Sequence, residues 1–340
     1  MTARFRTLLK HFSSVALALL FLYLAFRDVD ISGLWASMGS ADYWWMFLML
    51  LLLLGSHILR SLRWRYLLEP IKAGIGLRSL FSGVMLGYLV NNVLPRAGEL
   101  VRPYAIGRLE SISKSAALGT IVVERIMDGV SFLILLALMP LVYDGPLREV
   151  FPWLGESGII MSAVLLSFLI VAVVLMVRRD WTTRLVGFAE RILPGKSSLR
   201  IHRVVHSFLD GFLFLKQPRK YPVIVLLSAG VWFLYIAMMH AAFVAFHLQH
   251  QLGWRAAVVV LAISSIGVAL PTPGSTGSYH FFTAQTLTRL FFVPEKIALG
   301  YATLTHAVGY VGVSIIGLYF LYHDHIKVSD AVRNHSESAP

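Results

Sequence analysis

Long apolar runs restrict the folds open to this chain more than any other feature. A helix of about 20 apolar residues crosses the hydrocarbon core of a bilayer, which is roughly 30 Å thick. Six runs approach or exceed that length: Phe12–Phe26, Trp44–Leu62, Ala116–Val142, Gly158–Val177, Tyr221–Phe246 and Ile297–Tyr322. Only 14% of the residues are charged, against about 25% in soluble domains. We therefore predict an all-α, polytopic membrane helix bundle with about six full spans.

The charged residues between these runs indicate how the bundle is oriented. The net charge is +12, and Lys and Arg gather in short segments such as 1–11, 60–78 and 178–220. Such segments orient helices by the positive-inside rule and contact anionic lipid. They predict a multi-pass protein of the cell (inner) membrane with both termini in the cytoplasm, and no nucleic-acid partner. The first run also resembles a signal peptide, but it lacks a small-x-small site and is interpreted as an uncleaved helix.

Three further apolar runs are too short to span: Leu80–Leu94, Ala256–Leu270 and Phe281–Val293. The loop charges agree with the positive-inside rule if segments 80–101 and 256–293 each enter the membrane and return to the same side. If every apolar run spans instead, the loop charges fit less well. We predict one transmembrane domain over residues 1–325, with a polar tail over 326–340.

Both short segments contain the same kind of break. Residues 93–98 read VLPRAG and residues 269–274 read ALPTPG, so Pro95 and Gly98 correspond to Pro271 and Gly274, with Pro273 between. Proline removes a backbone donor and stops a helix, and the freed backbone groups are tolerated at membrane depth only inside protein or beside a polar cavity. Paired breaks of this kind indicate the midplane site of an inverted-repeat transporter. We predict that the two turns face each other; two ordinary interfacial loops are the alternative.

Three charges lie inside the run Ala116–Val142, namely Glu124, Arg125 and Asp128. Ionisable groups inside a span cost at least a few kcal/mol each and face the bundle interior or a cavity. Glu124 and Asp128 share a helix face and repel each other unless a cation lies between them. Arg96 or Arg102 could supply that cation. The cluster of Glu124, Arg125 and Asp128 then contacts a ligand, or only anchors the turn at Pro95, or does both.

Residues 199–216 carry apolar side chains at helical spacing, which indicates an amphipathic helix at the membrane interface or one packed on the bundle. Motifs of nucleotide-binding loops, zinc proteases and serine hydrolases are absent from the sequence. His323, Asp324 and His325 are adjacent, so their side chains diverge on a helix and no metal site is expected. The absence of cysteine excludes disulfides and thiolate metal sites.

Three motifs together resemble a known family. They are Asn92-x-x-Pro95-x-x-Gly98-Glu99-x-x-Arg102, Glu124-Arg125-x-x-Asp128 and Pro271-x-Pro273-Gly274-x-x-Gly277. This pattern is similar to the transmembrane region of lysylphosphatidylglycerol synthases, a flippase-like family. The resemblance implies about eight membrane segments, some of them re-entrant, and handling of lipid or lipid-linked headgroups. Because no soluble domain follows in this sequence, synthase activity is not expected. Ser275 and His280 stand where the family often has glycine and glutamate.

We predict a lipid transporter rather than an enzyme. It is expected to bind an anionic phospholipid or a lipid-linked headgroup between the two broken segments, and no cofactor or metal is expected. Arginine suits phosphate recognition because its guanidinium is permanently charged and bidentate. The predicted substrate-binding residues are Asn92, Arg96, Glu99, Arg102, Glu124, Arg125, Asp128, Gly274, Gly277 and His280. The alternative function is an enzyme or accessory subunit that acts on polyprenyl-phosphate or glycolipid substrates.

Overall fold

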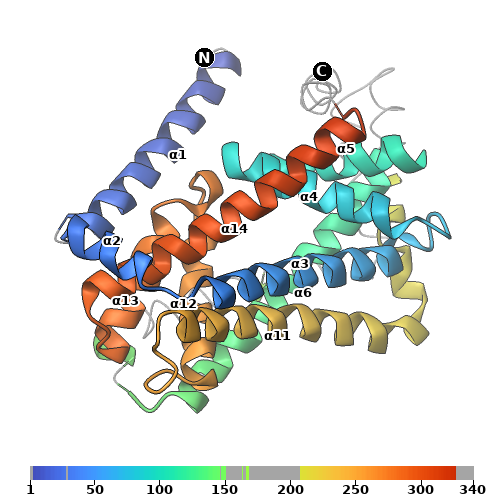
Figure 1. The fold of residues 1–340 in the computed structure, drawn as a ribbon. Helices are drawn as coiled ribbons and strands as arrows, with labels where there is room; N and C mark the ends of the chain where they lie inside the picture. Colours follow the sequence, from blue (N-terminus) through green and yellow to red (C-terminus); the bar gives the residue numbers. More distant parts are fainter. Residues whose placement is uncertain are drawn as a thin grey trace.

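The computed structural model describes residues 3–27, 30–145, 147–150, 163, 166–167 and 207–326, and within them the chain is α-helical with short 3₁₀ turns (Figure 1). This confirms the all-α prediction. The helices are α1 (Ala3–Phe26), α2 (Ile31–Gly39), α3 (Tyr43–Leu68), α4 (Leu77–Val93), α5 (Gly98–Glu110), α6 (Lys114–Val142), α7 (Leu147–Val150), α11 (Tyr221–Ala245), α12 (Trp254–Ala269), α13 (Ser278–Phe291) and α14 (Glu295–His323). The 3₁₀ turns are η2 (Leu213–Lys216), η3 (Pro218–Lys220) and η4 (Pro273–Ser275).

Five of the six predicted long runs coincide with α1, α3, α6, α11 and α14. By length and composition, three described helices are apolar enough to cross a membrane: α3, α14, and α11 with its preceding turn. A fourth span results if α1 and α2, which meet at 87°, count as one. The run Gly158–Val177 lies almost wholly outside the described residues, as does the tail 327–340.

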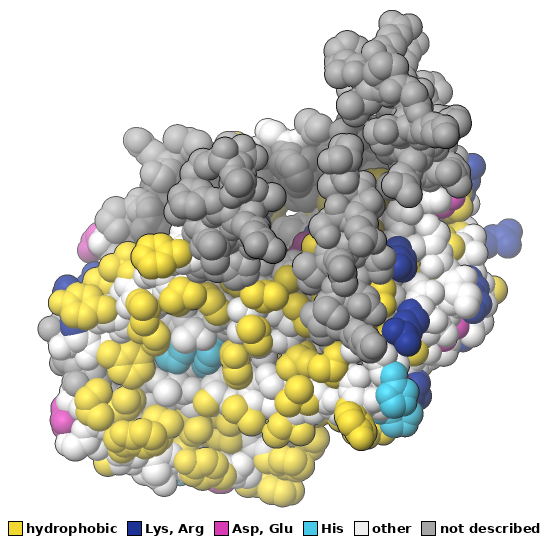
Figure 2. Space-filling view, turned by 90° about the horizontal axis from the view of Figure 1, so that it is seen from above, with side chains coloured by type: hydrophobic (Ala, Val, Ile, Leu, Met, Phe, Trp, Pro, Cys, Tyr) yellow, Lys and Arg dark blue, Asp and Glu magenta, His cyan; other side chains and the backbone are white. Residues whose placement is uncertain are grey.

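The outer surface of the described residues suits a lipid environment. Figure 2 shows hydrophobic side chains over much of the visible described surface, with Lys and Arg side chains toward its edges. Large exposed apolar side chains occur on several helices, including Trp35, Leu226 and Ile315. Apolar side chains that would be a liability in water are the normal outer surface of a membrane span.

Each of the two predicted breaks interrupts a helix and turns the chain back on itself. α4 ends at Val93 and α5 starts at Gly98, while α12 ends at Ala269 and α13 starts at Ser278. The returning helices pack closely because glycines lie at the crossings. A Cβ on Gly98 would overlap the carbonyl of Gly87, and a Cβ on Gly267 would lie 2.7 Å from the Ser278 carbonyl oxygen.

The two helix hairpins belong to two separate apolar cores. One core surrounds α4, α5 and the first half of α6, with Trp64, Met85 and Ile106 among its buried residues. The other surrounds α12, α13 and the first half of α14, with Phe243 and Leu287 among its buried residues. Figure 1 shows α3 and α11 side by side, and both helices contribute to each core.

The predicted amphipathic helix over 199–216 is only partly described. Residues 207–210 are helical, but the chain then turns at Gly211 and continues as η2, so the helix does not extend to Lys216. A Cβ on Gly211 would lie 2.6 Å from the Ala116 carbonyl oxygen of α6, so a residue without a side chain is needed at this close contact. Leu209, Phe212 and Phe214 are buried in the first core. The described part therefore packs on the bundle.

A polar contact joins the beginning of α4 to the end of α14. Arg78 Nη2 lies 2.6 Å from Asp324 Oδ1, and the Ser82 hydroxyl donates to Asp324 Oδ2 at 2.5 Å. Burial of this carboxyl opposes its ionisation, but the hydrogen bonds from Ser82 and Arg78 outweigh that effect and lower the pKa of Asp324 below its ordinary value. His323 and Asp324 are thus part of a helix junction.

We expect Asp324→Asn to lower the free energy of unfolding by about 1 kcal/mol near neutral pH, because an amide replaces a hydrogen-bonded carboxylate. A lowered folded-state pKa gives stability that is present above the unfolded-state pKa and is lost as the pH falls through the folded-state pKa. The difference in unfolding free energy between the variant and the wild type should therefore shrink below about pH 4. Thermal unfolding in detergent at several pH values measures it, with the exposed Asp144→Asn as control. A constant difference at every pH would contradict this assignment.

Candidate functional site

An ion-pair network joins α3, α5 and α6 in the interior of the bundle. Its members are Arg60, Arg63, Glu99, Arg102, Glu124, Arg125 and Asp128. The predicted site residues on α5 and α6 are thus brought together. The α3 arginines were not among the predicted site residues.

Glu124 is completely buried and lies at the centre of this network. Arg102 binds it in a bidentate manner, with Nη1 to Oε1 and Nη2 to Oε2 both at 2.9 Å. The Arg102 guanidinium also lies 4.4 Å from the centre of the Trp64 ring, and the Trp64 indole donates to the Thr120 hydroxyl at 2.8 Å. Arg102 is therefore held between a carboxylate and an aromatic ring, an arrangement that suits a planar guanidinium.

The cation expected between the two carboxylates of α6 is Arg60. Its Nη1 lies 2.7 Å from Glu124 Oε1 and 2.6 Å from Asp128 Oδ2. Arg63 completes the pairing with Nη2 at 2.7 Å from Asp128 Oδ1. Both arginines also donate to α11, Arg60 to the Tyr235 hydroxyl at 3.2 Å and Arg63 to the Ser228 hydroxyl at 3.0 Å.

Sequence reasoning missed Arg60 and Arg63 because they end an apolar run and were counted with the basic loop 60–78. A signal was present in their spacing. Residues three apart share a helix face, and the same face carries His57 and Trp64, both buried. Polar and aromatic residues in one stripe of a membrane helix point into the bundle. Arg65 lies on a different face and is exposed.

Arg125 and Glu99 form the outer edge of the network. Their side chains are 42% and 39% exposed, and Arg125 Nε lies 3.7 Å from Glu99 Oε1. Arg125 also approaches Glu124 at 3.3 Å and Asp128 at 3.7 Å. These distances are longer than the contacts of 2.6 to 2.9 Å that Arg60, Arg63 and Arg102 make. Arg125 is thus held loosely.

The two predicted turns meet, as the sequence indicated. Arg96 Nη2 donates to the Ala269 carbonyl at 3.2 Å. In a continuous helix that carbonyl would accept from residue 273, but Pro273 has no N–H. Arg96 therefore bonds a carbonyl oxygen that the second break leaves free. The hypothesis that Arg96 pairs with Glu124 or Asp128 is wrong, since its described bond is to the other hairpin.

The remaining predicted site residues surround the second turn. The Asn92 amide donates to the Ser314 hydroxyl at 2.9 Å, and the Tyr310 hydroxyl donates to the Asn92 carbonyl at 3.2 Å. Gly274 has a φ of 54°, and an added Cβ would lie 3.3 Å from Asn92 Cα. Asn92 on the first hairpin is therefore in direct contact with the second turn.

His280 lies in the first turn of α13, where its Nδ1 accepts from the Gly277 amide at 3.3 Å. Gly277 has a φ of 82°, and a Cβ there would overlap the Ala18 carbonyl of α1. The His280 ring centre lies 4.7 Å from that of His306, whose Nε2 bonds the Gly274 carbonyl at 2.8 Å. His280 thus organises the second turn and is not part of the arginine network.

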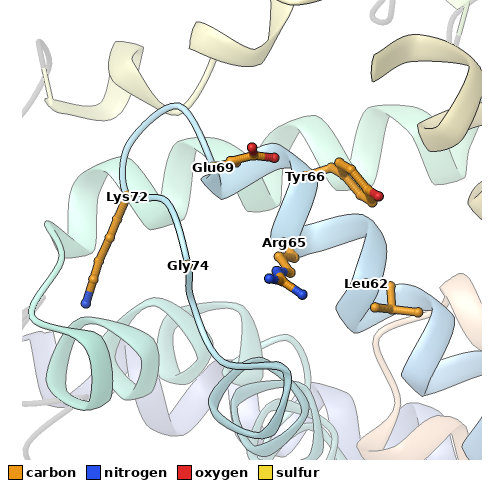
Figure 3. Close-up of a pocket in the computed structure, with 6 residues that line it drawn as sticks. All are labelled: Leu62, Arg65, Tyr66, Glu69, Lys72 and Gly74. Atoms are coloured by element: carbon orange, nitrogen blue, oxygen red, sulfur yellow. The ribbon is translucent and has the colours of Figure 1, made fainter. Parts of the chain in front are cut away.

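A surface pocket of about 290 Å³ lies where α3 runs into the loop before α4, and Figure 3 shows the residues that line it. It is lined by Leu62, Arg65, Tyr66, Glu69, Lys72 and Gly74. Two of its charges already have partners, because Glu69 pairs with Lys220 at 2.6 Å and Lys72 with Glu110 at 3.1 Å. The pocket is separate from the network, since Arg63 and Arg65 point in nearly opposite directions around the helix, about 160° apart. Among the described residues, no group of three or more His, Asp or Glu is placed to hold a metal ion.

The helical fold, the apolar outer surface and the interior charge network define a multi-pass integral membrane protein. Residues 12–317 match the family model of the lysylphosphatidylglycerol synthase transmembrane region, and the chain belongs to this family.

Archaeal relatives share much of the chain. It is 27% identical to a UPF0104 membrane protein of Methanothermobacter thermautotrophicus, over 64% of this chain and 67% of the relative. It is 24% identical to a UPF0104 membrane protein of Methanocaldococcus jannaschii, over 76% of this chain and 79% of the relative. It is 25% identical to a UPF0104 membrane protein of Pyrococcus horikoshii, over 71% of this chain and 75% of the relative. No solved structure matches the chain significantly.

Proposed function

We propose that this protein binds the headgroup of an anionic membrane lipid at Arg125 and moves lipid between the two leaflets. The observation that carries the proposal is the charge balance of the network. Four arginines (Arg60, Arg63, Arg102 and Arg125) face three carboxylates (Glu99, Glu124 and Asp128). An uncompensated charge inside a membrane protein is costly, so an anionic ligand would be bound favourably here.

Arg125 is the arginine best placed to contact that ligand. Arg60, Arg63 and Arg102 are buried and make short bonds to the oxygens of Glu124 and Asp128. Their role is to hold α3, α5 and α6 together. Arg125 is partly exposed and makes only longer contacts, so its guanidinium keeps donors for a phosphate, which it would bind as a charged fork.

The two hairpins are the parts of the bundle that would move during transport. Each has its own apolar core, and a hydrogen bond from Arg96 to the Ala269 carbonyl joins their turns. In inverted-repeat transporters, one repeat rocks against the other around a fixed site. We propose that the α4–α5 and α12–α13 hairpins are the two broken segments of such a repeat. The positive-inside rule supports cytoplasmic termini in the inner membrane.

Lipid as the cargo is supported by the family, whose name refers to the membrane region of enzymes that modify a phospholipid. The family does not by itself assign transport to this chain. Val130 of α6 is exposed, which supports a lipid-facing side on the helix that carries Arg125.

Arg125→Gln is expected to lower the rate of translocation of a fluorescent anionic phospholipid in proteoliposomes about tenfold, which corresponds to the loss of one charge-assisted bond. The matched control is Arg108→Gln, since Arg108 is exposed on α5 and is outside the network. Thermal unfolding of both variants in detergent checks that they are folded. A wild-type rate in Arg125→Gln, with the protein folded, would remove the proposal.

A further inference from the structure

Glu99 lies beside Arg125, the loosely held arginine of the network. The buried ion pairs of Glu124 and Asp128 do not include this carboxylate. Glu99 Oε1 lies 3.7 Å from Arg125 Nε, and the Glu99 amide donates to the Arg96 carbonyl of the preceding turn at 3.3 Å. Removing Glu99 from the network would leave the bonds of Glu124 and Asp128 unchanged. Support of the buried charges therefore does not explain the position of Glu99.

Glu99 lies at the N-terminal end of α5. It lies in the first turn of α5, directly after the helix starts at Gly98. The positive end of the helix dipole stabilises a carboxylate at that position. Its side chain is 39% exposed. A ligand that approaches Arg125 therefore meets a fixed negative charge at the edge of the site.

The net charge of the network determines which ligand charge it can balance. By formal charge, the four arginines and three carboxylates of the network leave a surplus of one positive charge. A ligand with one negative charge balances that surplus. A second negative charge would have no cation left to pair with and would be repelled by Glu99, whereas a zwitterion would leave the surplus in place.

We infer that Glu99 is a specificity-determining residue which restricts the site to headgroups with a single net negative charge, such as a phosphodiester without an amine, and rejects phosphomonoesters. The inference rests on the proposed function, because it concerns the ligand of Arg125. It places attraction at Arg125 and rejection at Glu99, and discrimination in proteins commonly combines the two.

The test compares lipids that differ in headgroup charge. Short-chain phosphatidylglycerol, phosphatidic acid and phosphatidylcholine are titrated by calorimetry into the full-length protein in an uncharged detergent at about pH 8, where a phosphomonoester, with a second pKa of about 6, is doubly ionised. We expect wild type to bind phosphatidylglycerol at least about tenfold more tightly than either other lipid. Glu99→Gln should tighten phosphatidic acid binding about tenfold and change phosphatidylglycerol binding by less than about threefold.

Glu295→Gln is the matched control, because Glu295 is also exposed in the first turn of a helix and is outside the network. It should leave all three affinities unchanged. The inference is overturned if wild type binds phosphatidic acid or phosphatidylcholine as tightly as phosphatidylglycerol, or if Glu99→Gln changes the two anionic lipids equally. The proposed function fails separately, if Arg125→Gln leaves phosphatidylglycerol binding and translocation unchanged.

Discussion

Glu124→Gln is expected to lower the free energy of unfolding by about 3–5 kcal/mol, the cost of breaking a buried ion pair by removing one partner. Glu124 is fully buried and accepts short bonds from Arg60 and Arg102. Glutamine has nearly the same shape, so the change isolates charge from volume. Asp128 would then be the carboxylate left to Arg60 and Arg63, and Arg102 would lose its described carboxylate partner. The amide NH₂ would also point a donor at a guanidinium.

Reversible unfolding in mixed micelles, followed by Trp fluorescence or circular dichroism, measures this loss. Glu295→Gln serves as the control, since it removes the same charge from an exposed position. Adding Arg102→Gln to Glu124→Gln should recover part of the stability, because it removes the arginine that Glu124 binds with both oxygens, and the double-mutant cycle gives their coupling. A Glu124→Gln protein within about 1 kcal/mol of wild type would show that the network does not hold the helices together.

Trp64→Ala should cost about 3–5 kcal/mol, the range for deleting a large buried aromatic side chain. Trp64 is completely buried, packs beneath Arg102 at 4.4 Å and closely approaches Gly83 of α4. Its removal would open a cavity between α3, α4 and α5 and would leave Arg102 without its aromatic support. The loss of packing contacts applies in a membrane as it does in water, because a void forfeits dispersion energy in either case.

Trp64→Phe separates the contributions, since it keeps a ring under Arg102 and removes the hydrogen bond to Thr120. We expect it to cost about 1–2 kcal/mol, the range for a lost buried hydrogen bond and a smaller ring. Trp44→Ala is the control, because Trp44 on the same helix is 71% exposed. Equal losses for Trp64→Ala and Trp44→Ala would mean that the position under Arg102 has no special role in stability.

Several features of the site could be predicted because they are local. A proline ends a helix wherever its partners lie, so the breaks at Pro95 and Pro271 were readable from the chain. Charges inside an apolar run must find partners, so Glu124 and Asp128 indicated a buried network before any contact was known. The bidentate partner Arg102 was named as one of two candidates, and the other, Arg96, instead bonds the Ala269 carbonyl.

Other features depend on how helices are rotated against each other. Arg60, Arg63 and Arg65 look alike in a basic stretch, yet packing turns the first two toward α6 and leaves the third exposed. The amphipathic pattern after residue 199 did not show that Gly211 would turn the chain against α6. His280 was predicted at the substrate site, and only the structure showed that its Nδ1 accepts from the Gly277 amide at the second turn.

The sequence by itself determined the class of protein, the positions of the two helix breaks and the presence of charges that need interior partners. These follow from the length of apolar runs and from the missing N–H of proline, which act within a few residues. Only the tertiary structure decided which arginines neutralise Glu124 and Asp128, and that Arg125 and Glu99 lie at the outer edge. An ion pair depends on which faces of distant helices meet, and that is decided by the packing of the whole bundle.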